Sequence, residues 1–319
     1  MISLGELGNK LFSQKKVALF CHVRPDGDTI GSAIALQEVL LNRGIKTDVL
    51  CDDPIPSRFF ILDGAKKIKT NLDNDYTALV AIDCADIDRL GSFASVFLNH
   101  PNTFCIDHHI SNTRYAKFNY VNDSASNAEN VYELIVENSV EITPSIANAI
   151  LLGIMTDTGA FKHRNVTENT LLVASKLKQK GADLNKIYYH MFTLQSKERA
   201  KLFGITMSKI KYYYENKLAV ATVRLSDLEL SNAKQDETEG FIDFVMGIDG
   251  VEVGVCIMET AVNKFKISFR SKGVDVNEVA SSFGGGGHVL ASGCQIYGEY
   301  EEVLDKVTFA IKRALPDII

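Results

Sequence analysis

The sequence lacks three features that each define a class of protein: a Cys-x-x-Cys pair, an apolar run long enough to cross a bilayer, and a block of like charge. Its six cysteines are scattered and lie mostly in or beside apolar runs, so we expect reduced core residues. The apolar run 149–155 is much too short for a membrane span, and residues 1–6 have neither the basic start nor the apolar stretch of a signal peptide. We therefore expect a soluble cytoplasmic protein.

The charge balance also limits the partners. With 34 Lys and Arg against 40 Asp and Glu, the formal net charge is -6. Such a surface does not attract polyanions as a whole, which disfavours a basic track for long nucleic acid. A phosphorylated ligand remains compatible with it, provided that metals, a few Arg or Lys and backbone amides meet the negative charge locally.

The first part of the chain has the pattern of an α/β domain. From Val17 to about His190, short β-branched runs alternate with helical patterns, which is typical of a parallel sheet covered by helices. Gly31-Ser32-Ala33 opens the first of these helices, and we expect these small residues to let the backbone approach a molecule bound at the strand end. The expected strands are 17–21, 46–51, 78–82 and 103–106, and the expected helices are 30–42, 126–138, 144–155, 167–181 and 185–192.

The pattern changes after residue 192. The segment 196–208 is charged and helix-forming, and the runs 218–224, 251–259 and 264–270 show the alternation of antiparallel strands. Helical stretches over 276–283 and 301–314 follow. The sequence predicts an α/β fold: an N-terminal parallel-sheet domain with helices on both faces (1–192), a helical linker (193–210) and a smaller α/β domain with a mixed or antiparallel sheet (211–319).

Three of the expected strands run into metal-ligand side chains, at the sheet edge where α/β enzymes place their chemistry. Asp83 ends an almost wholly apolar strand, and because an unpartnered buried carboxylate costs several kcal/mol, it needs a cation. The other two strands run into Asp107-His108-His109, where Asp107 can hold a neighbouring imidazole in the tautomer that metals require, and into the segment 22–28, His-Val-Arg-Pro-Asp-Gly-Asp.

Asp26 and Asp28 have the spacing of a calcium loop, but the fifth and twelfth loop positions are Ile30 and Gln37 instead of oxygen ligands. The same residues also suit a turn with Asp28 capping the next helix. Asp157, between threonines at the end of an apolar run, equally suits a helix C-terminus stopped by Gly159.

Charge favours a metal centre over these structural roles. Four carboxylates converging on one cleft would repel one another and any phosphate, and two divalent ions would cancel them. Oxygen donors with a minority of imidazoles suit Mn²⁺ or Mg²⁺, and the histidines favour Mn²⁺.

The run Gly284-Gly285-Gly286-Gly287-His288 is not a Walker loop, because no Lys and Ser or Thr follow it. Two interpretations stay open: a flexible loop, or a row of backbone amides that binds an anion. His288 and Arg270, which ends a strand in the same small domain, are both able to bind phosphate.

Five motifs, in order along nearly the whole chain, resemble those of the DHH phosphoesterase superfamily. The chain is most similar to short stand-alone bacterial members with a DHH-associated C-terminal domain, of the oligoribonuclease and phosphoadenosine-phosphate phosphatase type. One departure is Ala291-Ser292-Gly293, where relatives often carry Ala-Ala-Gly. The motifs are His22-x-x-Pro25-Asp26-x-Asp28, Asp83, Asp107-His108-His109, Thr156-Asp157-Thr158-Gly159 and Gly284-Gly285-Gly286-Gly287-His288.

The resemblance implies roles for these residues. Two ions, Mn²⁺ with Mg²⁺ or Co²⁺ as alternatives, would share Asp83 as a bridge. Asp107 would support the site and His109 would face the substrate phosphate. Homodimerisation through the metal domain is a further implication. The implied ligands are His22, Asp26 and Asp83 for the first ion and Asp28, Asp83, His108 and Asp157 for the second; the implied substrate-binding residues are Arg270, Ser271, Gly285, Gly286, Gly287 and His288.

The leading hypothesis is a two-metal phosphoesterase that hydrolyses short RNA, dinucleotides such as pApA, or 3′-phosphoadenosine 5′-phosphate to mononucleotides. A manganese-dependent inorganic pyrophosphatase shares the first four motifs, but the glycine-histidine run and the absence of a Ser-Arg-Lys cluster near the C-terminus disfavour it. A RecJ-type exonuclease needs additional domains that this length leaves no room for. A non-catalytic nucleotide sensor would be expected to have lost a metal ligand, and none is missing.

Overall fold

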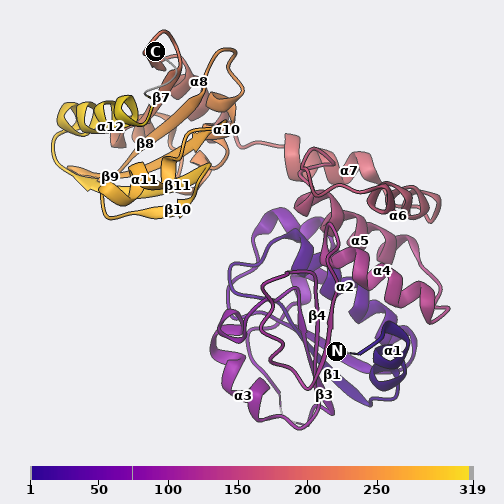
Figure 1. Ribbon diagram of the computed structural model, residues 1–319. Coiled ribbons are helices and arrows are strands. Elements are labelled where there is room, and N and C mark those ends of the chain that lie inside the picture. The colour runs from indigo at the N-terminus through magenta and orange to yellow at the C-terminus, as the bar shows by residue number, and fades with distance from the viewer. Residues whose placement is uncertain (1, 74, 316–319) are drawn as a thin grey trace. The chain divides into compact units, whose positions relative to one another are not determined.

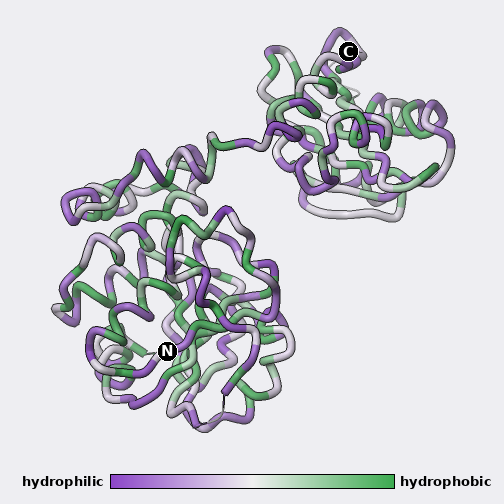
Figure 2. The backbone as a smooth tube through the Cα atoms, turned by 180° about the vertical axis from the view of Figure 1, so that it is seen from behind, coloured by the Kyte–Doolittle hydropathy of each residue, from purple (hydrophilic) through white to green (hydrophobic). Residues whose placement is uncertain are grey.

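The computed structural model describes residues 2–73 and 75–315 (Figure 1). The chain forms two compact units that meet between Leu194 and Gln195. Hydrophobic stretches run through the interior of the first unit, and hydrophilic ones lie mostly in its outer loops (Figure 2). In the described part of the chain, no helix has both the length and the apolar character needed to cross a membrane.

The first unit is built on a five-stranded sheet with the order β2-β1-β3-β4-β5. All neighbouring strands are parallel, and every residue of β3 and β4 is buried. This confirms the predicted parallel sheet, although β5 was not expected. The strands are β1 (Lys16–Phe20), β2 (Lys46–Leu50), β3 (Ala78–Ile82), β4 (Thr103–Asp107) and β5 (Phe118–Val121).

Helices cover both faces of this sheet, as Figure 1 shows. One face packs against α1 (Leu4–Phe12), α2 (Gly27–Asn42), α4 (Asn127–Glu137) and α5 (Pro144–Asp157) in a large apolar core. The other face packs against the 3₁₀ segment η3 (Ile87–Phe93) and α3 (Ala94–Asn99). The unit also contains η1 (Ser57–Ile61), η2 (Asp63–Lys67), α6 (Glu168–Gln179), α7 (Leu184–Tyr188) and the π-helical turn η4 (Tyr189–Thr193).

The start of α2 differs from the prediction. The helix begins at Gly27, with the Asp26 side chain accepting hydrogen bonds from the backbone N–H groups of Asp28 and Thr29. Asp26 is therefore the cap, and Asp28 lies inside the first turn. Gly31 serves helix packing instead of ligand approach, because a Cβ there would lie 2.3 Å from the Ala149 carbonyl oxygen of α5.

The second unit contains a six-stranded mixed sheet with the order β10-β11-β9-β8-β7-β6. Neighbours are antiparallel except β7 and β8, which are parallel. This confirms the predicted mixed or antiparallel sheet as a mixed one, in which β7 is antiparallel to β6 and parallel to β8. All residues of β7 are buried because both sides of the strand are covered. The strands are β6 (Lys211–Tyr213), β7 (Leu218–Val223), β8 (Val253–Ala261), β9 (Lys264–Ser271), β10 (Gly286–His288) and β11 (Ala291–Tyr297).

Two helix layers cover this sheet. One side of the sheet forms a core with α11 (Val276–Ser282) and α12 (Tyr300–Ala314), and the other side packs against α8 (Lys197–Met207), α9 (Leu225–Ser231) and α10 (Phe241–Met246), with η5 (Gln235–Thr238) nearby. Helix α8 lies in the range expected to link the domains. Its Leu202 is buried against Val223 and Phe241, so α8 contributes to the core of the second unit.

Candidate metal centre

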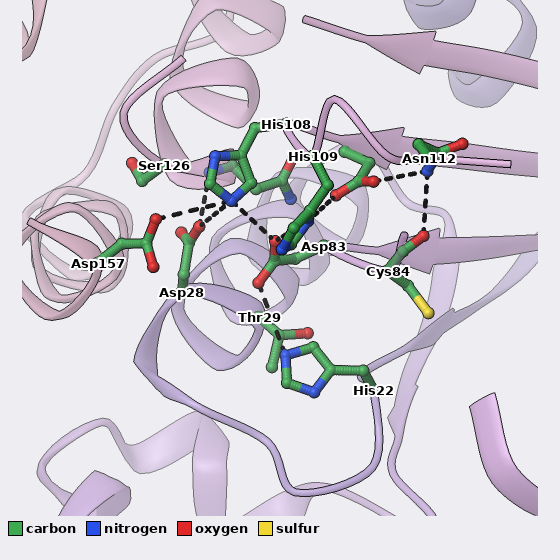
Figure 3. A network of polar contacts seen from close by, with 12 residues as sticks. His22, Asp28, Thr29, Asp83, Cys84, His108, His109, Asn112, Ser126 and Asp157 are labelled. Carbon is green, nitrogen blue, oxygen red and sulfur yellow. Dashed lines mark hydrogen bonds and ion pairs between the residues drawn. The ribbon is translucent and has the colours of Figure 1, made fainter. Parts of the chain in front are cut away.

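The elements of the first unit bring the predicted ligands to one place, the carboxyl edge of the parallel sheet. His22 follows β1, Asp83 follows β3, and His108 follows β4. Asp28 comes from the first turn of α2, and Asp157 is the last residue of α5. Figure 3 shows these side chains pointing toward one another, with the His108 ring between Asp28, Asp83 and Asp157.

The distances leave room for cations between the ligand atoms. His22 Nε2 lies 3.6 Å from Asp26 Oδ2 and 3.7 Å from Asp83 Oδ2. His108 Nε2 lies 3.4 Å from Asp83 Oδ1, 3.6 Å from Asp157 Oδ2 and 3.9 Å from Asp28 Oδ2. Most of these separations are too long for good hydrogen bonds, but they suit atoms that share a bound ion. The groups His22/Asp26/Asp83 and Asp28/His108/Asp157 each bring their ligand atoms within 4.8 Å.

Asp83 belongs to the first of these groups and forms another with His108 and His109, and it gives the strongest indication of a cation site. The residue is 2% exposed, and its Oδ1 has no hydrogen-bond partner among the described residues. One carboxylate oxygen faces His22 and the other faces His108. Because an orphaned buried carboxylate is costly, the residues present fit a metal centre at Asp83.

Both candidate histidine ligands direct Nε2 into the cluster. His22 Nδ1 lies 2.9 Å from the carbonyl oxygen of Val23, and His108 Nδ1 lies 3.0 Å from that of Ser124. Since a carbonyl only accepts, this contact favours the tautomer with the proton on Nδ1. The lone pair of Nε2 is then free for a metal.

Asp28 is held by a contact that the sequence did not reveal. Its carboxylate accepts hydrogen bonds from the backbone N–H groups of Asn127 (2.6 Å) and Ala128 (2.9 Å), at the N-terminus of α4. Burial raises the pKa of Asp28, and the carboxylates of Asp83 and Asp157 raise it further. The sequence predicted α4, but no local signal shows which side chain its first N–H groups meet.

Asp107 and His109 form a second polar unit beside the cluster. Asp107 is fully buried; it accepts one hydrogen bond from His109 Nδ1 (2.8 Å) and another from Asn112 Nδ2 (2.5 Å). Burial raises the pKa of Asp107, but these two hydrogen bonds outweigh it and hold the pKa below its usual value. Asn112 was not among the predicted site residues, because a lone asparagine after a histidine pair has no recognisable spacing.

Like that of Asp28, the pKa values of His22 and Asp157 are shifted well above their ordinary values. Burial by itself lowers the pKa of His22, but Asp26 and Asp83 outweigh it and raise the pKa to about 9. Burial raises the pKa of Asp157 to about 6, with His108 opposing and Asp83 adding to the shift. The cluster without ions therefore holds protons that a metal has to displace.

The predicted substrate-binding residues lie in the second unit. In the sheet register, His288 of β10 is opposite Ala291 of β11, which is opposite Arg270 of β9, so His288 and Arg270 share one face. Ser271 points to the other face, and its hydroxyl donates to the carbonyl of Val274. Arg270, Ser268 and Lys266 line a cavity of about 430 Å³ within this unit.

The glycine run is partly a strand, which corrects its description as a loop. Residues Gly286–His288 form the edge strand β10, paired with β11. Gly285 has no space for a side chain, because a Cβ would lie 2.2 Å from the carbonyl oxygen of Gly293. At least part of the glycine content thus allows two backbones to approach closely.

Known proteins share both units. Residues 16–154 match the model of the DHH family, N-terminal domain, and residues 215–315 match the DHHA1 domain. The Bifunctional oligoribonuclease and PAP phosphatase NrnA of Thermus thermophilus is 30% identical over 306 residues, which cover 92% of this chain and 89% of the relative. The protein of the same name in Bacillus subtilis is 28% identical, covering 88% of this chain and 89% of the relative.

Solved structures agree with this grouping. An exopolyphosphatase-related protein of Bacteroides fragilis superposes with a TM-score of 0.85 and 25% identity, covering 97% of this chain and 95% of that one. Exonuclease RecJ bound to manganese is similar in fold, with a TM-score of 0.55 and 11% identity over 98% of this chain and 95% of its own. DHH phosphoesterases are metal-dependent, in keeping with the acidic cluster described above. The chain belongs to the DHH family of phosphoesterases, with a DHHA1 domain following its DHH domain.

Proposed function

We propose that this protein is a two-metal phosphoesterase that hydrolyses short RNA and dinucleotides such as pApA to mononucleotides, and 3′-phosphoadenosine 5′-phosphate to AMP. The observation that carries the proposal is Asp83, a buried carboxylate with histidines next to both of its oxygens and with one oxygen that has no hydrogen-bond partner among the described residues. The relatives named as oligoribonucleases and PAP phosphatases, which align over most of their length, support this substrate class.

The cluster fits two metal positions with Asp83 in common. His22, Asp26 and Asp83 would hold the first ion, and Asp28, Asp83, His108 and Asp157 the second. Four carboxylates and two imidazoles are a donor set suited to Mn²⁺, with Mg²⁺ or Co²⁺ as alternatives. When bound, the ions supply a water nucleophile of lowered pKa and stabilise the charge that develops on the phosphoryl oxygens.

We assign His109 to contact with the substrate phosphate. Its Nδ1 is bonded to Asp107, and 37% of its side chain is exposed, so Nε2 is the nitrogen left for a ligand. The hydrogen bond from His109 to Asp107 raises the pKa of the imidazole above its usual value. A protonated His109 donates through Nε2 to a phosphate oxygen, and Asp107 with Asn112 fixes the ring orientation.

The second unit supplies residues that suit a nucleotide. Arg270, with Lys266 and Ser268, presents two cations and a hydroxyl in a cavity that is also lined by the acidic residues Asp236 and Glu239 and by the apolar residues Met258 and Ile242. A cation pair binds phosphate, and the apolar wall suits the flat face of a base. We assign Arg270 to the end of the substrate away from the scissile bond, together with His288 of β10, which shares its sheet face.

One experiment separates the candidate functions. Metal-stripped protein is refilled with Mn²⁺ and offered pApA, an RNA pentamer, 3′-phosphoadenosine 5′-phosphate and pyrophosphate, and the products are separated by chromatography. Release of mononucleotides from the first three, abolished by chelator, is the expected result. Hydrolysis of pyrophosphate alone would instead indicate a pyrophosphatase, and binding of nucleotides without turnover would indicate a sensor.

A further inference from the structure

Arg89 is a cation at the edge of the metal centre that no role described above uses. It lies in η3, the segment that follows β3 and Asp83. Its carbonyl oxygen accepts a hydrogen bond from the backbone N–H of Val23 (2.8 Å), which ties η3 to the segment that carries His22 and Asp26. Its guanidinium Nη2 lies 2.9 Å from His22 Nδ1. The side chain is therefore held next to a candidate ligand.

The contact with His22 does not satisfy the guanidinium as a donor. His22 Nδ1 lies 2.9 Å from the Val23 carbonyl oxygen and 2.9 Å from Arg89 Nη2. An Nδ1 that donates to the Val23 carbonyl carries a proton and cannot accept from Arg89, and this is also the arrangement in which Nε2 can bind a metal.

Arg89 has no other partner that would explain its position. It takes part in no ion pair in the described part of the chain, although the acidic cluster is adjacent. Its Nε–H is buried and without a hydrogen-bond acceptor among the described residues. A buried guanidinium donor left unpaired is costly, so the position favours an acceptor that arrives from outside the chain.

Charge identifies the class of that acceptor. The four carboxylates of the cluster balance the four positive charges of two divalent ions, so the negative charge of an incoming phosphoryl group is not yet balanced. A guanidinium offers two parallel N–H donors, Nη2 and Nε in this case, that match two oxygens of one phosphate. We propose that Arg89 is a phosphate-binding residue of the metal centre and binds the phosphoryl group that is attacked; this inference rests on the proposed function.

Binding of inorganic phosphate to the Mn²⁺-loaded protein, measured by calorimetry, tests this assignment without turnover. We expect Arg89→Gln to weaken phosphate binding by about tenfold or more, and Arg89→Lys, which keeps a point charge, to weaken it less. Mn²⁺ affinity should stay within about threefold of wild type, which also shows that the variants are folded. Arg43→Gln is the matched control, because Arg43 lies at the C-terminal end of α2, opposite the cluster, and bonds the Asn138 carbonyl.

Two results would overturn the assignment. Unchanged phosphate affinity in Arg89→Gln would show that the guanidinium does not meet the ligand, and a parallel loss of Mn²⁺ affinity would make Arg89 a positioning residue for His22. Hydrolysis of pApA by the wild-type protein is measured alongside, so that a failure of the proposed function is recognised separately. With the assignment correct, Arg89→Gln lowers kcat/KM by a similar factor for pApA and for bis(4-nitrophenyl) phosphate, because both present the scissile phosphate.

Discussion

Asp83 is the residue on which the metal centre depends most. Its backbone has a positive φ of 55°, which asparagine tolerates as well as aspartate does. We expect Asp83→Asn to abolish turnover of every substrate, because both metal positions lose a ligand. Without metal, the free energy of unfolding of the variant should equal that of the wild type or exceed it by about 1 kcal/mol, because the substitution removes one negative charge from a crowded acidic cluster. Chemical denaturation without metal measures the stability, and a turnover assay with Mn²⁺ measures the activity. Residual activity above one-tenth of the wild-type rate would contradict the assignment of Asp83 as a ligand of both metal positions.

Asn112 allows a test of the support given to His109. We expect Asn112→Ala to lower kcat by about 10- to 100-fold, because Asp107 loses a 2.5 Å hydrogen bond and the His109 ring loses its fixed orientation. Mn²⁺ affinity should not change, since neither residue is assigned as a ligand. Asn99→Ala, which removes only a bond to the Ser95 carbonyl on exposed α3, is the control. A loss of metal affinity equal to the loss of rate would place Asp107 among the ligands instead.

The titration of His22 predicts how metal affinity depends on pH. In the metal-free protein, the imidazole has a pKa of about 9 and is protonated at neutral pH, so an ion has to displace a proton. Affinity for Mn²⁺ should therefore rise with pH through the range from about 7 to 9 and level off above it. Calorimetry at pH 7 in two buffers of different ionisation enthalpy should detect release of about one proton per protein from His22. A titration that releases no proton would contradict the assignment of His22 as a ligand.

At the scale of secondary structure, packing between α2 and α5 sets the distance between Asp28 and Asp157. Gly31→Ala places a methyl carbon 2.3 Å from the Ala149 carbonyl oxygen, a backbone atom that cannot rotate away. We expect a loss of about 1–3 kcal/mol in unfolding free energy, together with weaker Mn²⁺ binding. Gly204→Ala, at an exposed position of α8 where nothing lies within 4 Å, should instead stabilise by about 0.5–1 kcal/mol. Urea denaturation of both variants measures whether the free energy of unfolding falls in the first and rises in the second.

Elements with a periodic apolar pattern could be predicted from the sequence, and those defined by tertiary contacts could not. β3 is an uninterrupted apolar run, so its bounds were predicted to the residue. β5 has only four residues, one of them a buried asparagine whose side chain bonds the backbone at Ala116, and no pattern indicated a strand. The parallel pairing of β7 with β8 was missed because every residue of β7 is buried, and a strand covered on both sides does not reveal from its sequence whether its neighbour is parallel or antiparallel.

The candidate site shows the same division. Aspartates and histidines at strand ends were predictable, because parallel strands bring their carboxyl ends to one edge. Asn112 and the N–H groups of Asn127 and Ala128 were not, since their partners are set by packing between segments that are distant in sequence. Arg89 was missed for the same reason, because its contacts with His22 and Val23 come from packing between η3 and the segment after β1. Residues at strand ends were thus predictable, and residues defined by tertiary contacts were not.

At the scale of the whole molecule, the two units carry separable parts of the proposed reaction. Arg270 lies in the second unit and lines its cavity, and within the described residues its side chain donates only to the neighbouring carbonyl at Phe269, so its removal costs little stability. We expect Arg270→Ala to raise KM for pApA by about tenfold or more and to leave hydrolysis of bis(4-nitrophenyl) phosphate unchanged. Lys272→Ala removes the same charge from an exposed neighbouring position and should alter neither substrate. An equal loss of kcat/KM for both substrates in the Arg270 variant would contradict the assignment of Arg270 to nucleotide binding.

Asp83 also has a consequence for how the protein responds to metal supply. An ion that binds first meets four carboxylates, whereas the second meets a cluster whose charge has been halved and whose central carboxylate is already engaged. Under the two-metal proposal, loading would then be stepwise, with a tight and a weaker stage. A fall in metal supply would remove the weaker ion first and stop hydrolysis while the other ion stays bound, and hydrolysis would resume when the second ion returns.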